Sequence, residues 1–303
     1  MKIDMLQLVA HLLICSVLTS CDRLEDPSEY LPIKDENSPI SGIYIKKIAD
    51  GIDNSYIMDD SPLNGQGFAV HGKTAYRLYD TGICQTYDFS NIESPIKLSS
   101  FPLGSSITKN HSNCAQFGGE MDGKPLLYVS GLSGKCFVEK VDPEGSECVQ
   151  TLTLLAMESY NISKSMNIIC GDDGYIWAFG DALSSNALTF AKLRKPDVSE
   201  GDITFSGEDV LDYWTEEGYI YTESVWQGGM VYEGFLYYVF GTPWTHRHIV
   251  IYNTETHEKV SDIDLDAVVY EEPEDCEMVD GQIILALARG TGYYIIDLEQ
   301  RAK

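Results

Sequence analysis

Five regularly spaced glycines constrain this chain of 303 residues more than any other feature. Each follows a polar residue and precedes a short run of β-branched or aromatic residues. The intervals between them are 51, 51, 60 and 47 residues, and the glycines are Gly72, Gly123, Gly174, Gly234 and Gly281. A repeat of about 50 residues with a strand pair around each polar-Gly turn is typical of a β-propeller. Five copies predict an all-β ring of five blades.

The fifth repeat lacks an outer strand in the sequence. Only a few residues follow its third apolar run, whereas residues 42–49, upstream of the first repeat, have the composition of a strand. If this N-terminal strand pairs with the last blade, the ring closes and no long sheet edge stays open. The alternative is a sixth, degenerate blade between Gly42 and Leu63. In either case we expect a single propeller domain over residues 41–303.

The N-terminus has the pattern of a secretory signal peptide over residues 1–20. Its apolar run, Leu8 to Leu18, is shorter than the roughly 20 residues that span a bilayer. The run ends in Leu18-Thr19-Ser20-Cys21, which resembles the lipobox of bacterial lipoproteins. That resemblance implies cleavage before Cys21, lipidation of Cys21 and a place in the bacterial cell envelope, in the outer membrane on its periplasmic or surface face. The alternative is an ordinary signal peptide with a chance cysteine.

Residues 21–40 are acidic, contain three prolines and show no periodicity. Such a segment buries too little apolar surface to offset its ordering entropy, so we expect a flexible tether. The formal net charge of the whole chain is −26. Because affinity for nucleic acid comes mostly from Lys and Arg, this charge excludes nucleic acid as an expected partner. Contact with the membrane is expected only through the lipid anchor.

A polar side chain stands six or seven positions before each repeat glycine. In a propeller the first strand of each blade lines the axis, so these side chains should form a ring there: Gln66, Gln116, Asn167, Gln227 and Glu274. Four further residues should lie at the mouth of this funnel: His111, Asn113, Trp226 and Glu272. Amides and carboxylates around a narrow channel suit water, a calcium ion or the hydroxyls of a sugar stacked on Trp226. The alternative is that they only solvate a wet pore.

Sequence motifs for catalysis or cofactor binding are not recognisable in the chain. Residues 118–125 differ from a phosphate-binding loop because Pro125 replaces the Ser or Thr that would reach magnesium. His246 and His248 could present two imidazoles on one face of a strand, as a metal pair requires, or could be exposed loop histidines. The sequence therefore predicts no catalytic residue and no resident cofactor.

Six cysteines remain once Cys15 is assigned to the signal peptide and Cys21 to the lipid. An even number in an exported protein permits disulfides. Cys136 and Cys148 flank one predicted hairpin and are the best candidate pair. Other cysteines lie within predicted strands, where a free thiol behaves as a small buried apolar group.

Short motifs in the chain resemble the blade starts of TolB-like and TagC-like propellers and, more distantly, of glutamine cyclotransferases. The motifs are Gln66-Gly67-Phe68, Tyr79-Asp80-Thr81-Gly82, Gln227-Gly228-Gly229 and Glu272-Pro273-Glu274. A glutamine cyclotransferase would carry a glutamate just before a Ser-Thr-Gly turn, where this chain has Arg77, Leu78 and Tyr79. The resemblance implies a propeller lipoprotein of the bacterial cell envelope.

Two functions remain open on the sequence. The first is binding of a glycan, a peptide or a protein partner at the funnel without catalysis. The second is a carbohydrate-active hydrolase or lyase of the cell envelope that uses Glu272 and Glu274 as acid and base. Binding is favoured because the carboxylates crowd one predicted strand, whereas such an enzyme needs two carboxyls across a cleft.

Overall fold

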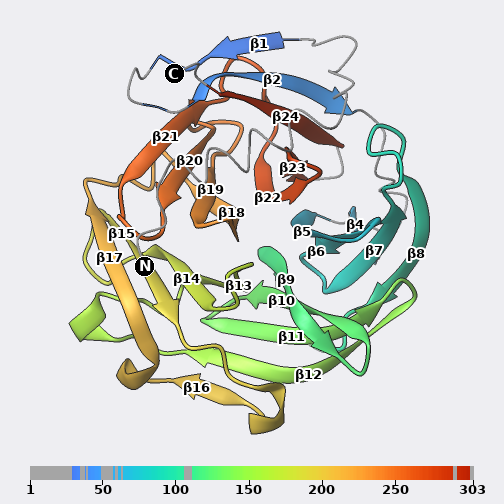
Figure 1. Ribbon diagram of the computed structural model, residues 1–303, viewed down its shortest axis with the longest axis vertical. Helices are drawn as coiled ribbons and strands as arrows, with labels where there is room; N and C mark the ends of the chain where they lie inside the picture. The colour runs from blue at the N-terminus through green and yellow to red at the C-terminus, as the bar shows by residue number, and fades with distance from the viewer. Residues whose placement is uncertain are drawn as a thin grey trace.

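Five small β-sheets stand around a common axis and form a closed ring (Figure 1). The computed structural model describes residues 29–34, 38, 40–48, 57–58, 61–62, 64–105, 111–288 and 292–300. The five-bladed propeller predicted from the sequence is confirmed, and the six-blade alternative is wrong. Within residues 42–63, the described strands outside blade 5 are only the two-residue β3 (Ile57–Met58) and β4 (Ser61–Pro62).

Each blade is an antiparallel sheet whose first strand lies nearest the axis. Blade 1 contains β5 (Gly65–His71), β6 (Thr74–Tyr79), β7 (Ile83–Asp88) and β8 (Ile96–Pro102). Blade 2 contains β9 (Cys114–Met121), β10 (Lys124–Gly131), β11 (Lys135–Asp142) and β12 (Gly145–Leu154). Blade 3 contains β13 (Asn167–Cys170), β14 (Ile176–Asp181), β15 (Ala187–Leu193) and β17 (Val210–Glu217). Blade 4 contains β18 (Trp226–Tyr232), β19 (Phe235–Phe240), β20 (His248–Asn253) and β21 (Lys259–Asp264). The first three strands of blade 5 are β22 (Pro273–Val279), β23 (Gln282–Leu287) and β24 (Tyr293–Gln300).

The five repeat glycines lie in the turns between the first and second strands of the blades. In blades 2, 4 and 5 both central residues of a two-residue turn have positive φ, as in Asp122 (53°) and Gly123 (72°). This is the geometry of a type I′ turn, whose twist matches that of the flanking strands and which favours Asp-Gly. The polar-Gly pattern therefore marks these hairpins for a stereochemical reason.

An N-terminal strand completes the last blade, as the sequence predicted. β2 (Ile40–Ile48) pairs antiparallel with β24, from Ile40 opposite Gln300 to Ile48 opposite Tyr293. Blade 5 is thus built from both ends of the chain, and the C-terminal strand β24 does not remain an open edge.

The predicted tether is wrong over part of its length. Glu29–Pro32 forms strand β1, which pairs with β2 and adds a fifth strand to blade 5. Tyr30 packs its ring on Tyr44 with centroids 5.0 Å apart and donates a hydrogen bond to Glu299. These contacts order a segment whose composition alone does not predict a strand. The signal peptide and Cys21 lie outside the described residues.

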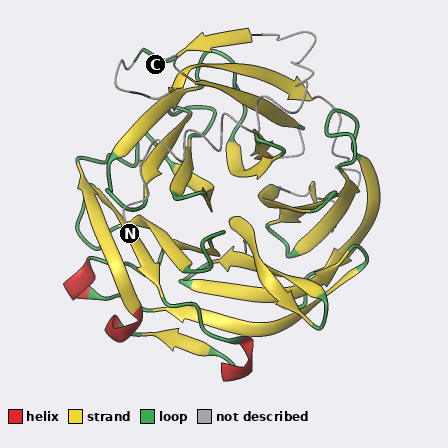
Figure 2. Cartoon of the chain, in the orientation of Figure 1, coloured by secondary structure: helices red, strands yellow, loops and turns green. Residues whose placement is uncertain are grey.

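Blade 3 sends a long connection across the outside of blade 2. Between β15 and β17 the chain forms β16 (Ile203–Phe205), which pairs in parallel with β12. Short 3-10 turns flank this strand, and the described residues contain no α-helix (Figure 2). None of the described segments forms a helix long and apolar enough to cross a membrane.

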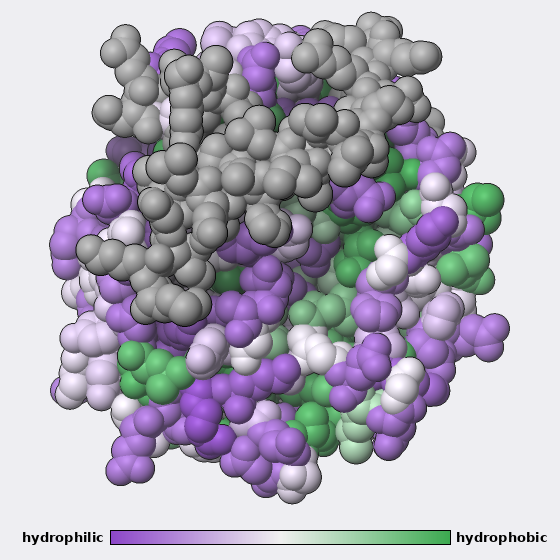
Figure 3. All heavy atoms as spheres, in the orientation of Figure 1, coloured by the Kyte–Doolittle hydropathy of each residue, from purple (hydrophilic) through white to green (hydrophobic). Residues whose placement is uncertain are grey.

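The hydrophobic core is divided into layers between neighbouring blades. Five major clusters of buried apolar side chains fill the five interfaces, so the inner strands of each blade are buried on both faces. On the face drawn in Figure 3, hydrophilic side chains predominate outside the grey residues, and apolar ones form small separate patches. Packing between blades therefore holds the ring together and leaves the axis to polar groups.

Candidate functional site

The predicted ring of polar residues exists, with one member on the innermost strand of each blade. Gln66 lies on β5, Gln116 on β9, Asn167 on β13, Gln227 on β18 and Glu274 on β22. Their exposed fractions lie between 2% and 7%. Burial of five amide or carboxylate side chains requires hydrogen-bond partners, and these partners divide the ring into two kinds of residue.

β-Bulges separate the ring members that face a cavity from those that do not. The pairing of the first two strands shifts register between Gly65 and Phe68 in blade 1, between Trp226 and Gly229 in blade 4, and between Pro273 and Asp275 in blade 5. Each shift contains one ring residue: Gln66, Gln227 or Glu274. Because a bulge re-aims side chains, these three turn into a common space.

Gln116 and Asn167 sit in regular pairing and bond to backbone instead. Asn167 donates through Nδ2 to the carbonyl of Gln227 at 2.7 Å and accepts from Asn113 Nδ2 at 2.8 Å. Gln116 bonds to the backbone of Val231. The structure therefore assigns Gln116, Asn167 and Asn113 to holding blades together and not to the cavity.

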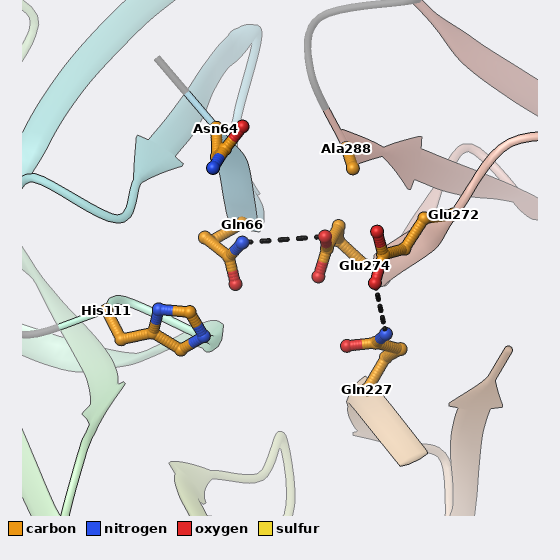
Figure 4. Close-up of a pocket in the computed structure, with 7 residues that line it drawn as sticks. All are labelled: Asn64, Gln66, His111, Gln227, Glu272, Glu274 and Ala288. Carbon is orange, nitrogen blue, oxygen red and sulfur yellow. Dashed lines mark hydrogen bonds between the residues drawn. The ribbon is translucent and has the colours of Figure 1, made fainter. Parts of the chain in front are cut away.

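The cavity at the mouth of the axis has a volume of about 200 Å³. Its lining is polar except for one alanine and comprises Asn64, Gln66, His111, Gln227, Glu272, Glu274 and Ala288 (Figure 4). Five of the nine binding residues predicted from the sequence are among them. Trp226 is not; it is half-buried and packs against the apolar cluster between blades 3 and 4.

Two amide–carboxylate contacts order the lining. Gln66 Nε2 donates to Glu274 Oε1 at 3.4 Å, and Gln227 Nε2 donates to Glu272 Oε1 at 3.1 Å (Figure 4). Gln227 Nε2 also donates to the carbonyl of Gly241 at 3.1 Å. Gln66 Oε1 is buried without a hydrogen-bond partner among the described residues. The cavity therefore presents a buried acceptor beside two carboxylates.

His111 faces these carboxylates from the other side of the cavity (Figure 4). It and Ser112 both have positive φ, 66° and 49°, which is uncommon outside glycine. The Ser112 carbonyl accepts from the N–H of Gly67 at 2.7 Å, which fixes this conformation beside the first bulge. Burial lowers the pKa of the His111 imidazole, against the opposing effect of Asp80 and Glu272. The net direction therefore favours the uncharged imidazole.

Arg77 is a buried cation behind the cavity lining and was not among the site residues predicted from the sequence. It donates to the carbonyl of Gln66 at 2.5 Å and to the carbonyl of Leu287, and so connects blades 1 and 5. Burial lowers the pKa of its guanidinium, while Glu274 and Asp275 are among the groups that oppose this effect. Its signal in the sequence is a lone arginine within the otherwise apolar or aromatic run Ala75 to Tyr79.

A buried carboxylate, Asp275, joins three blades at the axis and was not among the predicted site residues. It accepts from the N–H of Phe68 at 2.9 Å, of Ala115 at 3.1 Å and of Cys276 at 3.0 Å. Burial raises the pKa of Asp275 to about 7, although these donors favour the ionised form. Burial likewise raises the pKa of the nearby Glu277 to about 8. This acidic pair lies on β22 beyond the cavity lining.

The predicted disulfide between Cys136 and Cys148 is wrong, and all six cysteines of the described residues are free. On the β11–β12 ladder Cys136 lies opposite Leu152, whereas Cys148 lies opposite Glu139. The two cysteines are thus three strand positions apart, or about 10 Å at 3.3 Å per residue. A disulfide needs Cα atoms within about 7 Å, so the register forbids the bridge.

No protein-family model and no curated protein sequence matches the chain significantly. Among solved structures, the glutaminyl cyclase of Myxococcus xanthus matches with a TM-score of 0.50 and 13% identity, covering 85% of this chain and 95% of that chain. An exo-β-1,3-galactanase from Phanerochaete chrysosporium matches with a TM-score of 0.50 and 12% identity, covering 85% of this chain and 66% of that chain. At such low identity these likenesses show a shared propeller fold and nothing about activity.

Proposed function

We propose that this protein is a binding protein whose axial cavity recognises a small polar group on a glycan, a peptide or a protein partner. The observation that carries the proposal is the buried acceptor Gln66 Oε1, which belongs to a side chain of the cavity lining and has no partner among the described residues. An unpaired buried acceptor costs about 1–3 kcal/mol, which a donor on a ligand would recover.

The chemistry of the lining selects a ligand group that donates hydrogen bonds. Glu272 and Glu274 supply carboxylate oxygens, and Gln66 supplies an amide oxygen. The amide hydrogens of Gln227 are directed at Gly241 and Glu272, and Figure 4 shows its oxygen toward the cavity. Sugar hydroxyls or an ammonium group suit these acceptors, whereas a phosphate or carboxylate would be repelled.

The cavity size limits the ligand group. Its volume of about 200 Å³ is below the roughly 300–1,000 Å³ of pockets that enclose drug-sized molecules. We infer that it accepts one sugar residue or one amine-bearing side group of a larger molecule, whose remainder contacts the rim.

Binding without turnover is favoured over the alternative, a carbohydrate-active hydrolase or lyase. Glycosidases place two carboxyl groups on opposite sides of the bond that breaks. Glu272 and Glu274 instead come from one stretch of chain at the start of β22. Glu272 is also held by Gln227.

A screen on glycan arrays and amine-bearing peptides, followed by calorimetry and hydrolysis assays on the same compounds, tests the proposal. Gln66→Leu and Glu274→Gln are expected to weaken binding of a hit at least tenfold, while Glu258→Gln, on the exposed turn between β20 and β21, leaves it unchanged. Turnover that Glu274→Gln abolishes would replace the binding function with an enzymatic one. Unchanged affinity in both Gln66→Leu and Glu274→Gln would show that the ligand binds outside the axial cavity.

We further propose that Cys21 carries a lipid that anchors the propeller to the bacterial outer membrane. The lipobox-like residues Leu18 to Cys21 support this proposal. Metabolic labelling with an alkyne fatty acid in a bacterial host is expected to label the protein and to fail for Cys21→Ser. Equal labelling of both forms would contradict lipidation at Cys21.

A further inference from the structure

We propose that blade 4 carries a binding site for a divalent transition metal, best suited to Zn²⁺, formed by His246, His248 and Asp262. One ligand atom of each of the three side chains lies within 4.8 Å of the others. Imidazole nitrogens and a carboxylate oxygen are ordinary ligands of zinc. None of the three residues lines the axial cavity.

The register of one hairpin brings these residues together. β20 pairs with β21 so that His248 lies opposite Asp264 and Val250 opposite Asp262. Residues two apart along a strand share a face, so His248 and Asp262 are diagonal neighbours on the same face. His246 precedes His248 by two residues, and their ring centroids are 4.3 Å apart.

Each histidine has one nitrogen held by an orienting oxygen. His246 Nδ1 lies 2.6 Å from Asp266 Oδ2, and His248 Nε2 lies 2.6 Å from Ser224 Oγ. Metal-bound histidines characteristically use their second nitrogen in this way, which fixes the ring and its tautomer. The arrangement assigns His246 Nε2 and His248 Nδ1 to the metal.

For His248 and Asp262, only a small movement converts the present contact into coordination. His248 Nδ1 lies 2.7 Å from Asp262 Oδ1. Two ligand atoms at about 2.0 Å from a tetrahedral ion are roughly 3.3 Å apart. The ion would replace the proton of this hydrogen bond, and the two side chains would separate by a few tenths of an ångström.

The local charge supports a cation at this position. Asp264 lies opposite His248 on the same face of the hairpin and is well exposed, so it adds negative charge beside the site. Two basic side chains are near: Arg247 Nε is 3.0 Å from Asp266 Oδ1, and Lys259 Nζ is 3.7 Å from Asp262 Oδ2. Three carboxylates against two cations leave the cluster negative, and Lys259 is 46% exposed and can move away.

Zinc titration of the tag-free mature protein against a chromophoric chelator tests the site. We expect one high-affinity Zn²⁺ per chain, with X-ray absorption showing only nitrogen and oxygen ligands. His246→Gln and Asp262→Asn should each weaken this binding at least tenfold. Both residues are partly exposed, and circular dichroism checks that the variants fold.

Two histidines elsewhere in the chain provide matched controls. His257 Nε2 pairs with Asp212 Oδ2 at 2.8 Å as a single His–Asp contact, and His111 lies in the axial cavity. His257→Gln and His111→Gln are expected to leave the zinc affinity within twofold of the parent. No stoichiometric zinc in the parent protein, or an equal loss in either control, would overturn the site. Ligand binding in the axial cavity is tested with two other variants, Gln66→Leu and Glu274→Gln. Failure of the zinc site would therefore leave the proposed function untouched.

Discussion

The side chain of Gln116 pairs with the backbone of Val231 through two hydrogen bonds. Gln116 Nε2 donates to the Val231 carbonyl at 2.6 Å, and the Val231 N–H donates to Gln116 Oε1 at 3.0 Å. The carboxamide thus reproduces one rung of a β-ladder between β9 and β18. These strands belong to blades 2 and 4, which are not neighbours in the ring, so the bridge crosses the axis.

Replacing Gln116 by leucine is expected to destabilise the protein by about 1–3 kcal/mol. The buried N–H of Val231 loses its side-chain partner, and the Val231 carbonyl keeps only the longer bond from the N–H of Asp172 at 3.3 Å. Urea unfolding measures the change. Gln66→Leu is the matched control, since Gln66 makes one contact of 3.4 Å with Glu274 through its amide. An equal loss of stability in both variants would contradict the structural role given to Gln116.

Arg77 is expected to stabilise the wall of the cavity as well as the ring. In Arg77→Lys a single ammonium cannot reach both the Gln66 and the Leu287 carbonyl, so stability should fall by roughly 1–3 kcal/mol. Because Gln66 and Ala288 both line the cavity, affinity for a funnel ligand should fall too. Denaturation and calorimetry on the same preparation measure the two effects. An unchanged free energy of unfolding and an unchanged ligand affinity in Arg77→Lys would show that Arg77 stabilises neither the ring nor the cavity wall.

The buried carboxyls Asp275 and Glu277 predict an unusual dependence of stability on pH. Their ordinary pKa values are about 3.9 and 4.3, whereas burial raises the folded pKa values to about 7 and about 8. The folded state therefore holds more protons than the unfolded state between about pH 4 and pH 8. Stability from these groups is fully present below about pH 4 and falls as pH rises, by up to about 1.4 kcal/mol per pH unit for each group.

Glu277→Gln is expected to flatten this decline, most clearly between pH 6 and 8. Urea unfolding at several pH values measures the slope, with the exposed Glu258→Gln as control. Glu277 accepts a hydrogen bond from the N–H of Met278 at 3.0 Å, which the glutamine oxygen can also accept. The same slope in the variant and the parent would show that Glu277 is not the titrating group.

Removal of β2 is expected to open the ring. A chain beginning at residue 49 lacks β2, which leaves β24 paired only with β23 and exposes its outer edge, so this chain should aggregate or unfold without cooperativity. A chain beginning at Ser38 loses β1 but keeps β2, and should unfold cooperatively with only a modest loss of stability. Size-exclusion chromatography and thermal unfolding compare the two. Similar behaviour of both truncations would argue against closure by β2.

The sequence predicted the architecture because turn stereochemistry is local. Positive φ at Asp122-Gly123 and its counterparts leaves a direct mark on residue choice, and the missing outer strand indicated closure by an N-terminal segment. The axial position of the five polar residues followed from the fold. The fold alone did not predict which of the five face a cavity, because that depends on β-bulges at Gln66, Gln227 and Glu274.

The features that the sequence did not predict, or predicted wrongly, depended on register and on distant contacts. Cys136 and Cys148 flank one hairpin, yet an offset of three positions separates them. Asp262 completes the proposed metal ligand set from β21. Its position beside His248 depends on the register of β20 and β21, in which His248 lies opposite Asp264. Asn64 and Ala288 enter the cavity from the ends of strands and carry no chemical motif of their own.

Closure of blade 5 by β2 has a consequence for the order in which the protein can form. The partner of this strand is β24, whose residues 293–300 are the last described part of the chain to be synthesised. Blades 1 to 4 contain strands that are contiguous or nearly so and can assemble during synthesis, but the fifth cannot. The final sheet therefore forms only after residues 293–300 have been synthesised and have reached β2.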